Sequence, residues 1–303
     1  MPQSAESLRF ERDFAPPYGV AEELSPLVAR VVCHNPTPFT FTGTASFIIG
    51  SRSLAIIDPG PEDPQHLRAL MAAIGERPLT HILITHAHAD HSALAMKLKA
   101  LTGAKIAAFG RKAAERADVG AVALDARPDL SFVPDLSLAD GEAIEAPDFR
   151  LEALHTPGHT SDHMAYALPQ ERALFTGDHV MAWSTSVVAP PGGKMGSYLN
   201  SLEKLLARQD EIYWPTHGPH RREPHALVRG LIAHRRMREG AILKRLHEGP
   251  KSLAALVAGI YADVDPRLHA AAAQTTLAHL EHLIEKGLAR AAPRDGETLY
   301  RLS

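Results

Sequence analysis

Short runs of β-branched and apolar residues, separated by turns rich in proline, glycine and asparagine, predict that the chain begins with a sheet. After these runs, apolar residues recur at helical spacing, and the next apolar run is typical of a buried strand that ends at His86. Strands are expected at Val28–Val32, Phe47–Ile49, Leu54–Ile57, His81–Thr85 and Lys105–Phe109, and helices at Pro64–Ile74 and Asp90–Leu101. The pattern therefore contains a β-α-β order.

The second half of the chain has a similar order of elements, although no strict sequence repeat accompanies it. Strands are expected at Phe149–Leu154, Met164–Leu168, Ala173–Phe175 and Glu211–Trp214, and a helix at Ser197–Leu206. Two mixed sheets packed face to face, with helices outside, account for both halves. The predicted fold class is α/β (α+β).

Beyond Glu223 the pattern changes to nearly continuous helix, until Gly249-Pro250 interrupts it. Two more helices and a hairpin are expected, at Ser252–Tyr261, Pro266–Lys286, Leu288–Ala291 and Thr298–Leu302. Helix, helix, hairpin is the outline of a winged helix. We expect a first domain of residues 1–240 and a second of residues 241–303.

Composition narrows the setting but not the chemistry. The chain has 303 residues and a net charge of -3, so no overall field would gather nucleic acid or an anionic membrane. A single cysteine, Cys33, excludes an internal disulfide and a cysteine-rich zinc site. We found neither a secretory signal nor an apolar stretch of membrane-spanning length, so a cytoplasmic protein without a membrane partner is expected.

A cluster of potential metal ligands follows the strand that ends at His86. In extended chain, residues two apart point to the same side, so His86 and His88 can converge on one ion. Asp90 and His91 lie where the chain turns into a helix. Three imidazoles within so short a segment would crowd one tetrahedral ion, so a second metal is the simple solution.

Three later segments each place a His or Asp beside glycine or threonine at a strand end. They carry His159, Asp178 and His217. Together with the first segment they supply a mixture of imidazole and carboxylate that zinc, manganese or iron accepts. Asp178 is the best candidate to bridge two ions.

The H-x-H-x-D-H motif at His86–His91, with the segments around His159, Asp178 and His217, resembles the metallo-β-lactamase-fold hydrolases from about Val28 to His217. The resemblance implies an αββα sandwich. It also implies that one metal is bound by His86, His88 and His159 and the other by Asp90, His91 and His217, with Asp178 as the bridge. The best-known zinc β-lactamases have a cysteine where this chain has Asp178, so β-lactamase activity is expected to be weak or absent.

The segment His155–Met164 and the expected winged helix look like the lactamase-β-2-like subgroup, which contains animal endoribonucleases and fungal polyketide-releasing thioesterases. The site also resembles that of glyoxalase II. We therefore expect two Zn²⁺ ions, with Mn or Fe as alternatives, and a metal-bridging hydroxide that attacks a small or carrier-linked thioester or ester. Hydrolysis of single-stranded RNA is the alternative activity, and a metal-stabilised binding module is the non-enzymatic alternative.

Several further residues have two possible roles. Asp58 either accepts a hydrogen bond from a ligand imidazole or is a turn residue. Asp90 is a candidate proton acceptor. Tyr198 and Trp183 either contact substrate or pack in the core. His155, His163 and His179 are expected to pack or hydrogen-bond. The winged helix is not basic enough for nucleic acid, so it is expected to cover one edge of the cleft or form a homodimer contact. RNA binding would need cations at the cleft mouth, drawn from Lys194, Arg221, Arg222, Arg235, Arg236 and Arg238.

Overall fold

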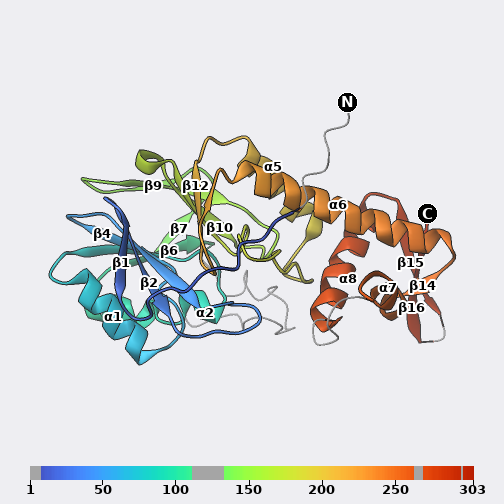
Figure 1. The fold of residues 1–303 in the computed structure, drawn as a ribbon, viewed down its shortest axis with the longest axis horizontal. Coiled ribbons are helices and arrows are strands. Elements are labelled where there is room, and N and C mark those ends of the chain that lie inside the picture. The colour runs from blue at the N-terminus through green and yellow to red at the C-terminus, as the bar shows by residue number, and fades with distance from the viewer. Residues whose placement is uncertain (1–7, 111–132, 263–268, 295) are drawn as a thin grey trace.

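The first half of the chain forms a seven-stranded mixed sheet in the order β1 to β7 (Figure 1). The computed structural model describes residues 8–110, 133–262, 269–294 and 296–303. The strands are β1 (Ala21–Ser25), β2 (Val28–Cys33), β3 (Thr44–Ile49), β4 (Leu54–Ile57), β5 (Leu79–Leu83), β6 (Lys105–Phe109) and β7 (Leu136–Leu138). Pairing is antiparallel from β1 to β4 and parallel from β4 to β7. This mixed character confirms the prediction.

A second sheet of six strands has the order β13-β12-β11-β10-β9-β8. Its strands are β8 (Ala143–Glu145), β9 (Arg150–His155), β10 (Met164–Leu168), β11 (Ala173–Gly177), β12 (Ile212–Pro215) and β13 (Arg221–Arg222). A 3-10 turn, η1 (Pro169–Glu171), joins β10 to β11. β11 and β12 are parallel because helix α5 (Met195–Leu206) returns the chain to the same end of the sheet.

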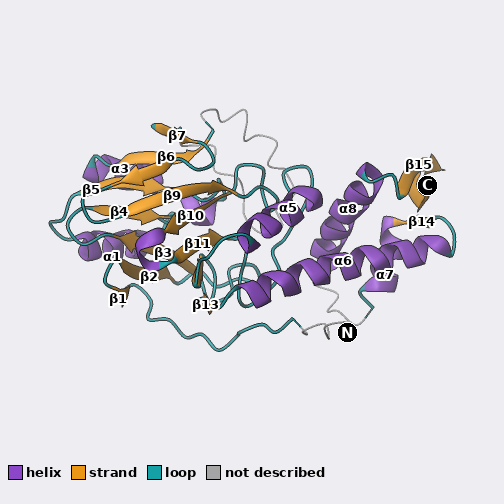
Figure 2. Ribbon diagram, turned by 90° about the horizontal axis from the view of Figure 1, so that it is seen from above, coloured by secondary structure: helices purple, strands orange, loops and turns teal. Residues whose placement is uncertain are grey.

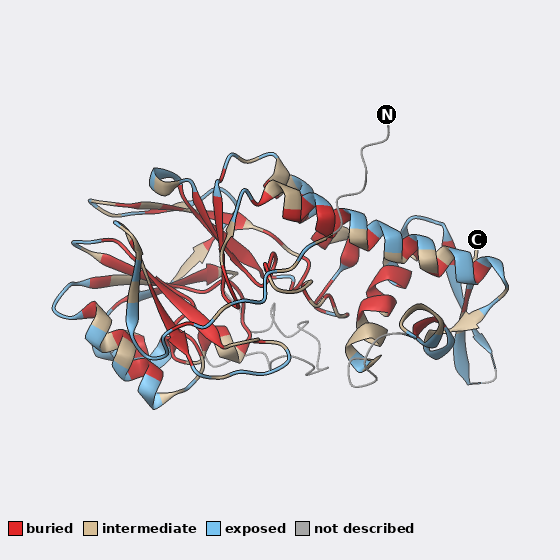
Figure 3. Ribbon diagram, viewed as in Figure 1, coloured by how far each residue is buried: buried red, intermediate tan, exposed pale blue. Residues whose placement is uncertain are grey.

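The two sheets face each other across an apolar core, and the helices cover their outer faces (Figures 2 and 3). Phe47 lies 5.0 Å from Phe175 and 6.1 Å from Trp214 between ring centroids, so it joins the two sheets. α1 (Pro64–Ile74) buries Leu70 and Ile74 against the first sheet. On the other side, α5 buries Leu202 against the second sheet. The four layers, helix, sheet, sheet and helix, confirm the predicted αββα sandwich.

The helix expected from Asp90 to Leu101 is two helices, α2 (Ala89–Ser92) and α3 (Ala95–Thr102). The loop after β4 interrupts the helical hydrogen bonds, because the Gly60 carbonyl accepts from the amide of Leu94 at 3.1 Å. The Gly60 amide in turn donates to the carbonyl of His91 at 2.9 Å. The break lets the short α2 turn toward the end of the first sheet.

Helix α6 (His225–His247) runs from the sandwich into the C-terminal unit without interruption (Figure 1). Leu227 and Leu231 pack on the second sheet, whereas Ile242 and Leu246 belong to the C-terminal core. The boundary predicted at residue 240 therefore falls inside a helix, and it stays a prediction.

The C-terminal unit is a helix pair with a small sheet. It contains β14 (Lys251–Ser252), α7 (Leu253–Ile260), α8 (His269–Glu285), β15 (Ala289–Arg294) and β16 (Glu297–Leu302), with the sheet order β14-β16-β15. The expected start of the second helix, at Pro266, lies outside the described residues. In the described part of the chain, no helix combines the length and apolar character needed to cross a membrane.

Candidate metal centre

The predicted ligands gather at one end of the two sheets because the strands that carry them run in the same direction. His86 and His88 follow β5, which is parallel to β4. In the second sheet, His159 follows β9, Asp178 follows β11 and His217 follows β12. β9 and β11 are both antiparallel to β10, and β12 is parallel to β11, so all three strands end at one edge.

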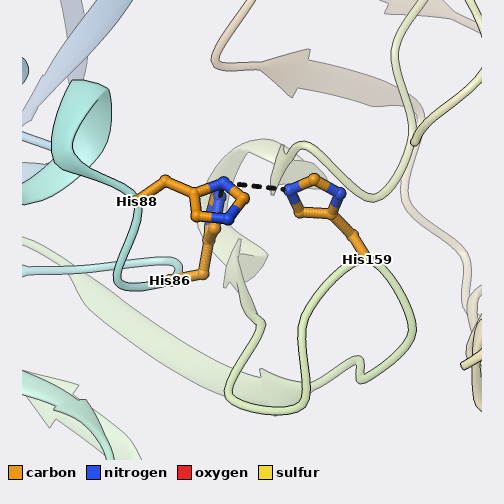
Figure 4. Close-up of side chains that lie close together, drawn as sticks. All are labelled: His86, His88 and His159. Atoms are coloured by element: carbon orange, nitrogen blue, oxygen red, sulfur yellow. Dashed lines mark hydrogen bonds between the residues drawn. The ribbon is translucent and has the colours of Figure 1, made fainter. Parts of the chain in front are cut away.

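His86, His88 and His159 form the first cluster (Figure 4). His88 Nδ1 lies 2.9 Å from His86 Nε2 and 3.3 Å from His159 Nε2. The three side chains are buried, with 1% of His86, 6% of His88 and 5% of His159 exposed. Three ring nitrogens therefore point at one small volume.

Asp90, His91 and His217 form the second cluster. Asp90 Oδ2 lies 3.2 Å from His217 Nε2 and 3.6 Å from His91 Nε2. Asp90 comes from α2, which the loop after β4 holds at this end of the sheet.

Asp178 lies between the two clusters. Its Oδ2 is 3.8 Å from His159 Nε2 and 3.5 Å from His91 Nε2, and its Oδ1 is 3.5 Å from His217 Nε2. One carboxylate thus faces ligands of both clusters, which is the arrangement that a bridging ligand requires.

The donor atoms themselves are of the kind that holds a divalent cation. His91 Nε2, Asp90 Oδ1 and Asp178 Oδ1 are buried and have no hydrogen-bond partner in the described structure. Buried polar atoms are normally paired, and unpaired ones often mark an ion. Imidazoles with carboxylates are a donor set that divalent zinc, iron and manganese accept.

Electrostatics within the cluster favour ionised carboxylates. Burial by itself would raise the pKa of Asp90, but the nearby His91 and His217 outweigh it and lower the pKa to about 2. Burial also opposes ionisation of Asp178, yet His217 and His91 hold its pKa well below the usual range. Burial and the neighbouring His91 and His88 lower the pKa of His86, which keeps its imidazole neutral.

Each of three imidazoles donates its Nδ1 proton to a fixed oxygen, so its Nε2 faces the cluster. His91 donates to Asp58 Oδ2 at 2.8 Å, His217 to the Gly43 carbonyl at 3.0 Å, and His159 to the Val187 carbonyl at 2.7 Å. Such partners fix the ring orientation and tautomer. Asp58 thus contacts a candidate ligand, as the first of its two predicted roles requires.

Asp162 and His163 also hold the clusters in place. The Asp162 carboxylate accepts from the amide of Ala87, between His86 and His88, at 3.1 Å. His163 Nε2 accepts from the Asp178 amide at 3.2 Å, as its expected hydrogen-bonding role requires. No role was predicted for Asp162 from the sequence, although it directly precedes His163 in the segment that follows His159.

A solvent-open cavity of about 400 Å³ lies beside the clusters. Its lining residues are Pro38, Phe39, His88, Asp90, His159, Asp178, Met181, Trp183, Ser184, Thr185, Val187 and His217. Trp183 stacks on Phe41, with ring centroids 4.8 Å apart and planes 12° apart. The lining of the cavity therefore combines residues of the two clusters with a largely apolar wall.

Tyr198 is not among the described residues that line the cavity, and it packs in the core, which was the second of its two predicted roles. It is fully buried, and its hydroxyl donates to the carbonyl of His179 at 3.1 Å. Its ring, at the start of α5, belongs to the core cluster that also contains Leu227 and Leu231 of α6.

Family models match both parts of the chain. One described as "Metallo-beta-lactamase superfamily" covers residues 39–217, and one described as "Beta-lactamase associated winged helix domain" covers residues 252–296. These matches agree with the predicted fold class.

Similar proteins include "Beta-lactamase-like protein 2 homolog" of Drosophila melanogaster, 31% identical over 91% of this chain and 94% of that protein. "Atrochrysone carboxyl ACP thioesterase dmxR1" of Cryptosporiopsis sp. (strain 8999) is 29% identical over 80% of this chain and 70% of that protein. The chain spans 58% of another fungal relative, "Lactamase-like protein GME11357" of Pestalotiopsis microspora.

Solved structures show the same fold. A beta-lactamase domain protein from Burkholderia ambifaria matches with a TM-score of 0.79 and 21% identity, over 96% of both chains. TTHA1623, solved in a di-iron-bound form, matches with a TM-score of 0.52 and 26% identity, over 67% of this chain and 96% of that one. The match to the Burkholderia ambifaria protein extends through the C-terminal unit.

Proposed function

The chain belongs to the metallo-beta-lactamase superfamily, and we propose that it is a dinuclear metal-dependent hydrolase that cleaves a thioester or ester. His86, His88 and His159 would hold one metal ion, and Asp90, His91 and His217 the other. Asp178 would bridge them. The distances within each cluster and the position of Asp178 between them support this assignment.

Two divalent cations supply Lewis-acid activation of a carbonyl oxygen and lower the pKa of water from 15.7 toward roughly 7. The chain's own residues orient the ligands and move the proton. The low pKa of Asp90 keeps its carboxylate ionised, so this carboxylate can accept a proton from the attacking water. Water adds to the acyl carbon, the carbon–sulfur bond breaks, and the proton held by Asp90 passes to the departing thiolate. The products are a thiol and a carboxylic acid, which releases its remaining proton to solvent and leaves as a carboxylate.

The lining of the cavity is the observation that carries the proposed substrate class. Apart from the metal-cluster residues, its described lining consists of apolar, aromatic and hydroxyl side chains, without a lysine or arginine. Apolar walls with a few polar groups are typical of sites for small molecules and acyl groups. The printed name of a fungal relative, an ACP thioesterase, agrees with a carrier-linked thioester.

The same lining does not favour RNA. A phosphate backbone needs a cationic groove. Arg221 pairs with Glu11, Arg236 pairs with Glu203, and Arg235 is 2% exposed. None of the cations expected at the cleft mouth belongs to the described lining of the cavity.

We propose zinc as the metal because imidazole-rich sites suit it, with iron and manganese as alternatives that the same donors accept. A specific observation supports iron as an alternative, since the similar structure of TTHA1623 was solved in a di-iron-bound form. Growth in defined metals followed by metal analysis separates these cases.

The proposed substrate class is tested with initial rates on a panel of N-acetylcysteamine thioesters that carry short, long and aromatic acyl groups, beside single-stranded RNA. Thioester turnover, lost in Asp178→Ala together with bound metal, is expected. Trp183→Ala should raise KM with a smaller effect on kcat, and Trp183→Phe should keep the wild-type KM. Cleavage of RNA without turnover of any thioester would overturn the proposal.

A further inference from the structure

Arg235, in the middle of α6, is a buried cation that is 2% exposed. Among the described residues, its guanidinium forms no ion pair with a carboxylate. Its Nε has no hydrogen-bond partner within that part of the chain. Burying a charge without a counter-ion costs free energy, so a compensating contact is expected.

The guanidinium contacts the loop after Asp178 and the side chain of Tyr198. Nη2 donates to the backbone carbonyl of Ser186, and the guanidinium carbon lies 5.2 Å from the ring centroid of Tyr198. An aromatic face attracts a cation but does not fix the direction of its N–H groups. The hydrogen bond to Ser186 is therefore the directional contact, and it reaches the loop that forms one wall of the cavity.

Ser186 and Val187 connect that hydrogen bond to two of the proposed ligands. The Ser186 hydroxyl donates to the carbonyl of Asp178, and the Val187 carbonyl accepts from His159 Nδ1 at 2.7 Å. The peptide group between Ser186 and Val187 contains the carbonyl that Arg235 holds. A shift of this peptide would move the acceptor of His159 and release the backbone of Asp178.

We infer that Arg235 is a positioning residue, which fixes the Ser186–Val187 peptide and thereby orients His159 and Asp178 for metal binding and hydrolysis. This inference rests on the proposed function. It links the metal centre to α6, the helix that continues into the C-terminal unit (Figure 1). Arg235 itself touches neither the cavity nor the ligand side chains, so its effect passes through the peptide.

The test compares Arg235→Met and Arg235→Lys with Arg236→Met, a matched control whose arginine is on the same helix and pairs with Glu203 at the surface. Metal affinity is measured by competition with a chelator, and the ligand geometry by the visible absorption spectrum of the Co²⁺-loaded protein. kcat and KM are measured on the thioester that the wild type cleaves best. Far-UV circular dichroism verifies folding.

Partners that orient a metal ligand typically contribute ten- to hundredfold to metal affinity or activity. Arg235→Met should therefore bind Co²⁺ about tenfold or more weakly, change its spectrum, and lose kcat to a similar extent with KM little altered. Arg235→Lys should fall between Met and the wild type, because an ammonium can donate one bond to the Ser186 carbonyl. Arg236→Met should behave as the wild type does.

A folded Arg235→Met protein with the Co²⁺ affinity, spectrum and kcat of the Arg236→Met control would overturn the inference. If Arg235→Met does not fold, Arg235→Lys decides, and wild-type affinity and spectrum in that variant would overturn it. A wild type that binds two metals but cleaves no thioester would refute the proposed substrate instead. The affinity and spectrum would still test Arg235 in that case.

Discussion

Asp58 offers a sharp test of how the second cluster is held. It is fully buried, and its Oδ2 accepts from His91 Nδ1 and the hydroxyl of Thr85 at 2.8 Å and from that of Thr216 at 2.9 Å. Oδ1 accepts from the amide of Thr85 at 2.8 Å. Two oxygens thus receive four donors. The carboxylate joins the start of the His86–His91 segment to the strand end that carries His217.

Replacing Asp58 with Asn preserves the shape but changes one acceptor into a donor. The amide oxygen must stay at the Oδ1 position, because the Thr85 amide can only donate. The NH₂ group then faces His91 Nδ1, which must become an acceptor. The proton of the ring moves to Nε2, the atom that points at the proposed metal, and an Nε2–H cannot coordinate an ion.

The expected cost follows from this change of tautomer. Loss of such an orienting partner lowers metal affinity by about ten- to hundredfold, or about 1.4–2.7 kcal/mol. The loss should fall on the ion held by Asp90, His91 and His217, whereas the ion held by His86, His88 and His159 should be retained. Asp58→Asn should therefore bind one metal tightly and the other weakly.

The assay is chelator competition with the wild type, Asp58→Asn and Asp148→Asn. Asp148 is a matched control, because it accepts backbone amides of Ser51 and Arg52 in a surface turn far along the sheet from the ligands. Asp148→Asn should bind both metals as the wild type does. Two unchanged affinities in Asp58→Asn would refute the reasoning about the tautomer.

Three further changes test the fold around the centre. Tyr166→Phe removes the buried hydrogen bond to the Ile84 carbonyl and should lower the free energy of unfolding by about 0.5–1.5 kcal/mol, measured by urea denaturation. Gly177→Ala should lower the free energy of unfolding by more than about 1 kcal/mol and weaken metal binding, because φ is +51° and an added Cβ would lie 2.6 Å from His163 Nε2. Wild-type stability of this variant would contradict the expectation. Burial would raise the pKa of Glu239, but the nearby imidazoles of His279 and His282 outweigh it and lower the pKa. The stabilising contribution of Glu239 is therefore present above the unfolded-state pKa of about 4.3 and is lost as the pH falls through the lower folded-state pKa. Glu239→Gln should flatten that acid dependence in thermal melts, and an unchanged profile would contradict the assignment.

The elements, and the His and Asp residues that the structure brings together, could be predicted from the sequence because their determinants are local. Strands such as β2 and β4 are continuous apolar runs between turn residues, and the H-x-H-x-D-H spacing lies in one short segment. The break between α2 and α3 could not be predicted, since it depends on the carbonyl of Gly60, which is distant in sequence.

The residues that orient the ligands were harder to predict. Asp162 accepts from Ala87, 75 positions away, and Arg235 donates to Ser186, 49 positions away. Neither contact follows from a periodic pattern or a motif. Tyr198 shows a related case, because its sequence position allowed either a substrate contact or core packing, and only the structure shows that it belongs to the core cluster beside α5 and α6. The homodimer contact and the cytoplasmic location stay predictions.

The central claim is a dinuclear centre that hydrolyses a thioester, and metal analysis with rate measurements on one purified sample tests it most directly. We expect two metal equivalents per chain, turnover in the thioester panel, and loss of both metal and turnover in Asp178→Ala. A protein that binds no more than one equivalent at full activity, or that cleaves single-stranded RNA but no thioester, would contradict it.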